Sequence, residues 1–145
     1  MMPARRLAIS AIINELPKIK KNAEKAQWLE KHDSFQLRQV LRINYDDSIE
    51  FTIPDSRPPW KKNEYLDADS LFYQETRRLK IFIKGGGYEN LNQVKKESLF
   101  ISLLEDLDNN DAELLVQMLQ KKPFKGLTKK ALEEFIPNIY ETKVV

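Results

Sequence analysis

Apolar residues recur every three or four positions through almost all of this 145-residue chain. That spacing gathers them on one face of an α-helix, whereas a half-buried strand needs strict alternation. The interval 46–69 breaks the pattern, and Pro54, Pro58 and Pro59 exclude a regular helix there. The sequence therefore predicts an all-α fold of six to seven helices with a proline-rich extended connector. The expected helices cover approximately residues 7–16, 23–31, 35–45, 71–83, 93–107, 112–120 and 129–136.

The composition indicates a single compact domain over residues 1–145. Hydrophobic residues make up 41% of the chain and glycines number only four, which is typical of a globular protein that buries a real core. We assign residues 46–69 to the extended connector, whose aromatic residues are expected to pack on the helices, and residues 138–145 to a C-terminal tail. No apolar run approaches the roughly 20 residues that span a bilayer, so we expect no membrane segment.

The sequence offers few residues for catalysis. It contains no cysteine and one histidine, His32, which excludes thiolate metal sites and cysteine nucleophiles. Carboxylates cluster at residues 105–111, where helix capping explains those near the next helix start and a magnesium site is the weaker alternative. Glycines 85–87 follow a predicted helix rather than a strand, so they indicate a helix terminator and not a phosphate loop. We therefore expect a protein without enzymatic activity, metal or cofactor.

Residues 121–137 carry the strongest functional signal. A basic turn around Gly126 joins two predicted helices, Thr128 is suited to cap the second helix, and Pro137 ends it. The free amides at the start of that helix are therefore surrounded by lysines, an arrangement that suits a phosphate. A capped helix with solvated lysines is the structural alternative. The candidate binding residues in this stretch are Lys121, Lys122, Lys125, Gly126, Thr128, Lys129 and Lys130.

Basic residues earlier in the chain extend the candidate site. The net charge is only +2 at pH 7, so any binding of nucleic acid has to be local rather than spread over the whole surface. Three lysines follow the first predicted helix, and two arginines lie one turn apart on the third. These additional candidates are Lys18, Lys20, Lys21, Arg38 and Arg42.

The C-terminal stretch resembles the end of the all-helical N-terminal DNA-binding domain of T-even-type phage ATP-dependent DNA ligases. In that family, an Asp-x-Glu-x-Leu helix is followed by a Gly-x-Ser turn and a final helix that ends in proline. The segments 13–16, 29–31 and 37–45 are similar to the opening helices of the same domain, in the same order. The residues that match the C-terminal motifs are Asp111, Glu113 and Leu115, then Gly126 and Thr128, then Pro137.

This resemblance implies a function. The ligase domain grips duplex DNA through sugar-phosphate contacts, so we expect backbone binding rather than base readout. The adenylating Lys-x-Asp-Gly motif is absent, and the chain resembles a stand-alone small phage protein. The implied role is in phage DNA replication, repair or transcription, in the cytoplasm of an infected bacterium. The alternative is a protein-interaction module on the same scaffold, which binds a phage or host replication or transcription component.

Overall fold

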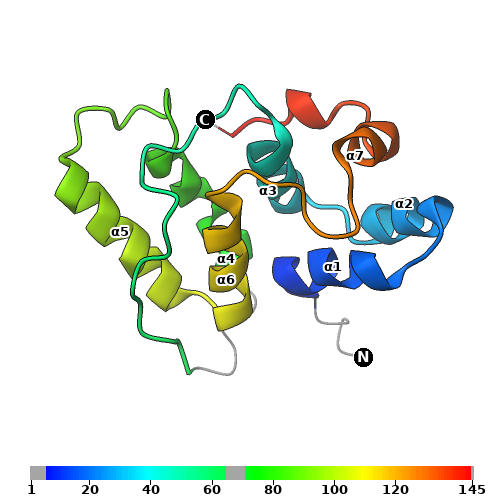
Figure 1. Ribbon diagram of the computed structural model, residues 1–145, viewed down its shortest axis with the longest axis horizontal. Helices are drawn as coiled ribbons and strands as arrows, with labels where there is room; N and C mark the ends of the chain where they lie inside the picture. The colour runs from blue at the N-terminus through cyan, green and yellow to red at the C-terminus, as the bar shows by residue number, and fades with distance from the viewer. Residues whose placement is uncertain (1–5, 65–70, 145) are drawn as a thin grey trace.

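The structure is a computed structural model that describes residues 6–64 and 71–144. Within these ranges the chain forms seven α-helices and no strand, so the prediction of an all-α fold is confirmed. Figure 1 shows α5 at one end of the molecule, α2 and α7 at the other, and α3 between them. The α-helices are α1 (Ile9–Glu15), α2 (Asn22–Lys31), α3 (Phe35–Tyr45), α4 (Leu71–Glu75), α5 (Gln93–Asp106), α6 (Asn109–Met118) and α7 (Lys129–Phe135).

Two 3-10 helices continue an α-helix directly: η1 (Leu16–Lys18) follows α1, and η3 (Thr76–Phe82) follows α4. A third, η4 (Ile139–Glu141), is separated from the end of α7 by three residues. The sequence predicted one long α-helix over residues 71–83, which is wrong, because the chain winds more tightly from Thr76 onward. Thr76, Leu79 and Phe82 are buried at intervals of three, and a 3-10 helix places residues of that spacing on one face. The three-residue spacing of the buried side chains therefore matches the tighter helix better than an α-helix.

The described part of the predicted connector, residues 46–64, contains no helix. It is fastened at Phe51, which forms a single antiparallel bridge with Ile83. Next to this bridge, the Thr52 amide donates to the Phe82 carbonyl at 2.7 Å. Phe51 and Trp60 pack against the core as the sequence predicted, while Tyr65 lies outside the described residues.

One apolar core runs through the molecule, from Ile9 in α1 to Ile139 in η4. Its centre includes the rings of Phe82 and Phe100, which meet edge to face with centroids 5.2 Å apart. Full burial of a side chain of this size contributes about 1.5–3 kcal/mol. The core therefore joins helices from both halves of the chain into one body.

Helix α1 takes its N-terminal cap from a distant element. Its own N-cap residue, Ala8, provides no side-chain acceptor. Instead, the Ser10 amide donates to Oδ1 of Asp111 at 3.0 Å, and Asp111 is fully buried in α6. The carboxylate that matches the ligase motif thus has a structural role at the start of α1.

Two helix starts show how caps set exposure. Asn22 is the first residue of α2, and Lys21 before it makes no side-chain cap. The Asn92 side chain caps α5, and Val94 in the first turn of that helix is 77% exposed. The glycines at 85–87 form a turn after η3, with positive φ at Gly85 and Gly87.

Within the described residues, no helix has the length and apolar character needed to cross a membrane.

Candidate nucleic-acid interface

The turn around Gly126 packs directly on the end of the first helical segment. A Cβ atom at Gly126 would lie 2.6 Å from the backbone nitrogen of Pro17, and the residue has a φ of +84°. Both conditions require glycine, because other residues rarely adopt this φ and their side chains would collide with η1. The turn that carries Lys125 is therefore held beside the segment that carries Lys18. Figure 1 shows the chain between α6 and α7 passing close to α1 and α2.

Tyr45 and Lys25 fix the backbone of this turn. The Tyr45 hydroxyl accepts a hydrogen bond from the Phe124 amide at 2.8 Å and donates to the Leu127 carbonyl at 2.6 Å. The Lys25 ammonium donates to the Gly126 carbonyl at 2.7 Å. Burial raises the pKa of the Tyr45 phenol to about 12. The backbone of the turn is thus held by hydrogen bonds at three residues, Phe124, Gly126 and Leu127.

Thr128 caps α7, as the sequence predicted. Its Oγ1 accepts a hydrogen bond from the Ala131 amide at 3.1 Å. The two lysines that follow differ in their surroundings. The Lys129 ammonium lies 2.7 Å from Oδ2 of Asp47, and this hydrogen bond raises the pKa of Lys129. Lys130 is exposed and makes no ion pair within the part of the chain that the structure describes.

Two lysine-bearing segments, residues 18–25 and 122–130, meet where Gly126 packs on Pro17. Lys18 lies 3.6 Å from Glu15, and both side chains are largely exposed. Lys129 pairs with Asp47, and the remaining lysines of these two segments pair with no carboxylate among residues 6–64 and 71–144. We define the basic corner as Lys18, Lys20, Lys21, Lys25, Lys122, Lys125 and Lys130.

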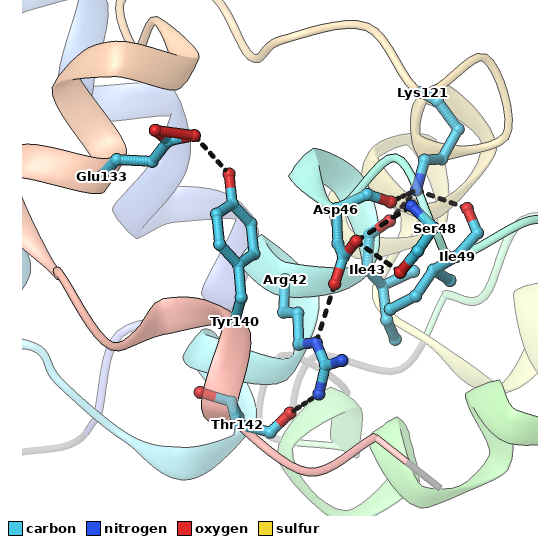
Figure 2. Close-up of polar contacts among 9 residues, drawn as sticks. All are labelled: Arg42, Ile43, Asp46, Ser48, Ile49, Lys121, Glu133, Tyr140 and Thr142. Atoms are coloured by element: carbon cyan, nitrogen blue, oxygen red, sulfur yellow. Dashed lines mark hydrogen bonds and ion pairs between the residues drawn. The ribbon is translucent and has the colours of Figure 1, made fainter.

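Lys121 was predicted as a binding residue, but its ammonium points into the protein. Figure 2 shows it at the end of α3, where it donates to the carbonyls of Ile43, Asp46 and Ile49 at 2.5, 2.6 and 2.7 Å. These three bonds use every donor of the ammonium. Burial lowers the pKa of Lys121, and its φ of 56° turns the chain after α6. The Lys121 ammonium is therefore engaged by the fold and is not available to a phosphate.

Arg38 and Arg42 are also engaged by the fold. Arg38 donates to both carboxylate oxygens of Asp33, at 2.7 and 3.0 Å, and to Asn138 at 3.2 Å. Arg42 pairs with Asp46 at 3.1 Å and donates to the Thr142 carbonyl (Figure 2). The two guanidinium groups thus fasten the predicted C-terminal tail to α3. They contact this segment rather than the turn around Gly126.

Lys25 is a residue of the basic corner that the sequence analysis missed. It lies four residues after Lys21, and positions four apart share one face of a helix. This spacing was the available signal. The role of Tyr45 has no signal in the sequence, because a hydrogen bond to residues about 80 positions later leaves no local pattern.

The carboxylates and the histidine have structural partners. Asp108 caps α6 by accepting from the Asn110 amide at 3.0 Å, and Glu105 accepts from the Lys61 amide at 2.7 Å. His32 lies against the Trp28 ring with centroids 4.2 Å apart, and burial lowers the pKa of its imidazole. No group of three potential metal ligands occurs among the described residues.

Residues 12–125 match a family of unknown function (DUF6433). The matched range includes Pro17 and Lys125, so it spans most of the basic corner, while α7 lies beyond it. No curated protein and no solved structure matches the chain.

Proposed function

The chain belongs to this DUF6433 family of unknown function, and we propose that it binds duplex DNA without catalysing a reaction on it. The observation that carries the proposal is the close packing of Gly126 on Pro17. This packing holds two lysine-bearing segments side by side. Six of the seven lysines of the basic corner have no carboxylate partner among the described residues. Five of these six are exposed, so their charges remain available to an anion, while the ammonium of the sixth, Lys25, also donates to the Gly126 carbonyl.

The chemistry of the basic corner suits the sugar-phosphate backbone. A lysine ammonium is a compact charge on a flexible stem, so it contacts phosphates without reading base edges. Binding releases condensed counterions, and affinity falls with salt by a slope of about 0.9 per phosphate contact. We therefore propose binding that depends on salt and has little sequence preference. The resemblance to the ligase clamp domain supports the same mode, and we extend it to a role in phage DNA replication, repair or transcription inside an infected bacterium.

A salt titration with a fluorescent duplex tests the proposal. The variant Lys20→Ala/Lys21→Ala/Lys125→Ala removes three exposed charges, and we expect it to flatten the log–log salt slope by about 2.7 if all three contact phosphate. The matched control is Lys62→Ala/Lys80→Ala/Lys95→Ala, which removes three exposed charges from the connector, η3 and α5.

The control variant is expected to bind duplex like the parent. Because we propose binding without catalysis, a nicked duplex incubated with the protein is expected to be recovered unchanged. Equal slopes for the two triple variants would place the DNA site elsewhere. A parent protein that does not bind duplex at low salt would contradict the proposal itself.

A protein-interaction module is the second candidate, and one groove favours it. A cavity of about 270 Å³ lies between the connector and α5, and Pro54, Pro58 and Ile101 contribute apolar surface to it. A phage or host replication or transcription protein is the partner of this alternative. If the parent binds no duplex, the groove variant Ile101→Asp tests it, because loss of a co-purifying protein in this variant would point to the groove.

A further inference from the structure

A second concave surface lies between the start of α3 and the α4–η3 segment. It encloses about 500 Å³, and α3 contributes Phe35 and Gln36 to it, while α4 and η3 contribute Tyr73, Gln74 and Arg77. Arg6, which precedes α1, closes one side. None of the described residues that line this groove carries a carboxylate. Its electrostatic character is therefore positive, although it shares no residue with the basic corner.

The arginines of this groove differ from the other described arginines. Arg38, Arg42, Arg57 and Arg78 each pair with a carboxylate. Arg77 is exposed and makes no hydrogen bond or ion pair within residues 6–64 and 71–144. The Arg6 guanidinium lies 3.7 Å above the Tyr73 ring and likewise has no carboxylate partner among the described residues. The two described arginines without a carboxylate thus line the same groove.

Phe35 presents an open aromatic ring at the edge of the groove. It is 53% exposed, more than any other large aromatic hydrophobic residue in the described chain. Phe35 is the first residue of α3. Its backbone is fixed because Ser34 caps the helix, with the Ser34 Oγ accepting a hydrogen bond from the Leu37 amide at 3.0 Å. An exposed ring on a fixed backbone is suited to stack on a flat partner.

Two carboxamides complete the groove. The side chains of Gln36 and Gln74 make no hydrogen bond to any residue that the structure describes. Each carboxamide offers both donors and an acceptor. The groove therefore combines positive charge, an aromatic face and amides that can pair with base edges.

We propose that this groove binds a single-stranded segment of nucleic acid. One unpaired base stacks on Phe35, the neighbouring phosphate contacts Arg77, and Gln36 and Gln74 hydrogen bond to the base edge. A paired duplex cannot occupy the site in this way, because its bases are already stacked on each other. An acidic peptide would satisfy the arginines but would leave the exposed ring without a flat partner. The inference rests on its own residues and does not require duplex binding at the basic corner.

Binding of a fluorescent oligothymidine of about eight nucleotides tests the proposal, since single-strand sites cover about 4–16 nucleotides. Phe35→Ala is expected to weaken binding roughly 5- to 150-fold, the range of ~1–3 kcal/mol per stacked base. Phe35→Tyr keeps an aromatic ring and is expected to retain most of the affinity. Arg77→Gln is expected to lower the salt slope by about 0.7. Val94→Ala, at an exposed apolar residue of α5, is the control and is expected to bind like the parent.

An abasic strand of the same length separates stacking from charge. It carries the same phosphates, so it is expected to bind more weakly and to be insensitive to Phe35→Ala. Equal affinity of the two strands, or no effect of Phe35→Ala on oligothymidine, would overturn the proposal. Binding of a labelled polyglutamate peptide in place of oligothymidine would overturn it in favour of an acidic peptide. If the protein binds oligothymidine but not duplex, only the proposed function is contradicted, because the effect of Phe35→Ala is measured on single strands.

Discussion

At the scale of single residues, the two adjacent lysines 121 and 122 show how neighbours take opposite roles. Lys122 is exposed, whereas the Lys121 ammonium ends α3 by binding three carbonyls. The carbonyls at the end of a helix have no partner within it, and a cation there is favourable. The Ile43 carbonyl lies in the last turn of α3, while the Asp46 and Ile49 carbonyls lie in the segment that follows, so Lys121 ties the end of α3 to this segment.

Replacing Lys121 with methionine keeps the apolar stem and removes the ammonium. One hydrogen bond to a charged group usually contributes about 1.5–3 kcal/mol, and we expect the free energy of unfolding to fall by that amount or more. Urea denaturation of the purified variant measures this loss. Lys122→Met is the matched control and is expected to change stability by no more than about 0.5 kcal/mol. Equal midpoints for the two variants would show that Lys121 contributes nothing to stability.

Tyr45 gives a prediction about alkaline pH. Its pKa in the folded protein is about 12, above the ordinary value of 10.0, so folding favours the neutral phenol. The stabilisation is therefore fully present below pH 10 and is lost as the pH rises toward 12. Tyr45→Phe is expected to lower stability at neutral pH by about 1–3 kcal/mol, since the Phe124 amide and Leu127 carbonyl lose their partner.

The same variant is also expected to show a shallower loss of stability over this alkaline range than the parent. Urea melts at several pH values compare the two proteins. A parent and variant with parallel stability curves would show that Tyr45 does not titrate with unfolding.

At the scale of elements, the contact between the Gly126 turn and η1 determines whether the two lysine-bearing segments meet. Alanine at Gly126 meets both a strained φ and a collision with Pro17, whereas Gly85 has the same φ of +84° and no atom within 4 Å of its Cβ position. Gly85→Ala is therefore expected to cost only the backbone strain, about 1–2 kcal/mol. Gly126→Ala is expected to lower the free energy of unfolding by more than Gly85→Ala does. It is also expected to weaken duplex binding under conditions where the variant protein is fully folded. Thermal melts and the duplex titration measure the two effects, and equal losses for the two glycines would contradict the packing argument.

The elements differ in how far the sequence determines them. Periodicity was sufficient for α3, because Leu37, Val40 and Leu41 recur at helical spacing and Ser34 caps the helix. It was misleading after Glu75, where local spacing does not distinguish the end of an α-helix from its continuation in 3-10 form. Helix boundaries depend on packing against other elements, and the bridge between Phe51 and Ile83 is such a contact.

At the scale of the whole molecule, the fold class followed from the sequence but the composition of the site did not. The turn, its glycine and the Thr128 cap were predictable, since each has a local signature. The separation of Lys121 from Lys125 was not, because it depends on carbonyls more than 70 residues earlier. The groove at Phe35 also escaped the sequence analysis, because its residues come from three separate segments.

The cap that Asp111 provides to α1 has a consequence for the protein while it is being made. The capping carboxylate is 101 residues away from Ser10, and at about 5–20 residues per second the ribosome needs roughly 5–20 s to add that length. A helix of seven residues is only marginally stable by itself, so α1 is not expected to be stable before Asp111 has been translated. The bond from Lys25 to Gly126 spans another 101 residues, and the bond from Arg38 to Asn138 spans 100. These three bonds of the N-terminal third therefore form only after nearly all of the described chain has been synthesised.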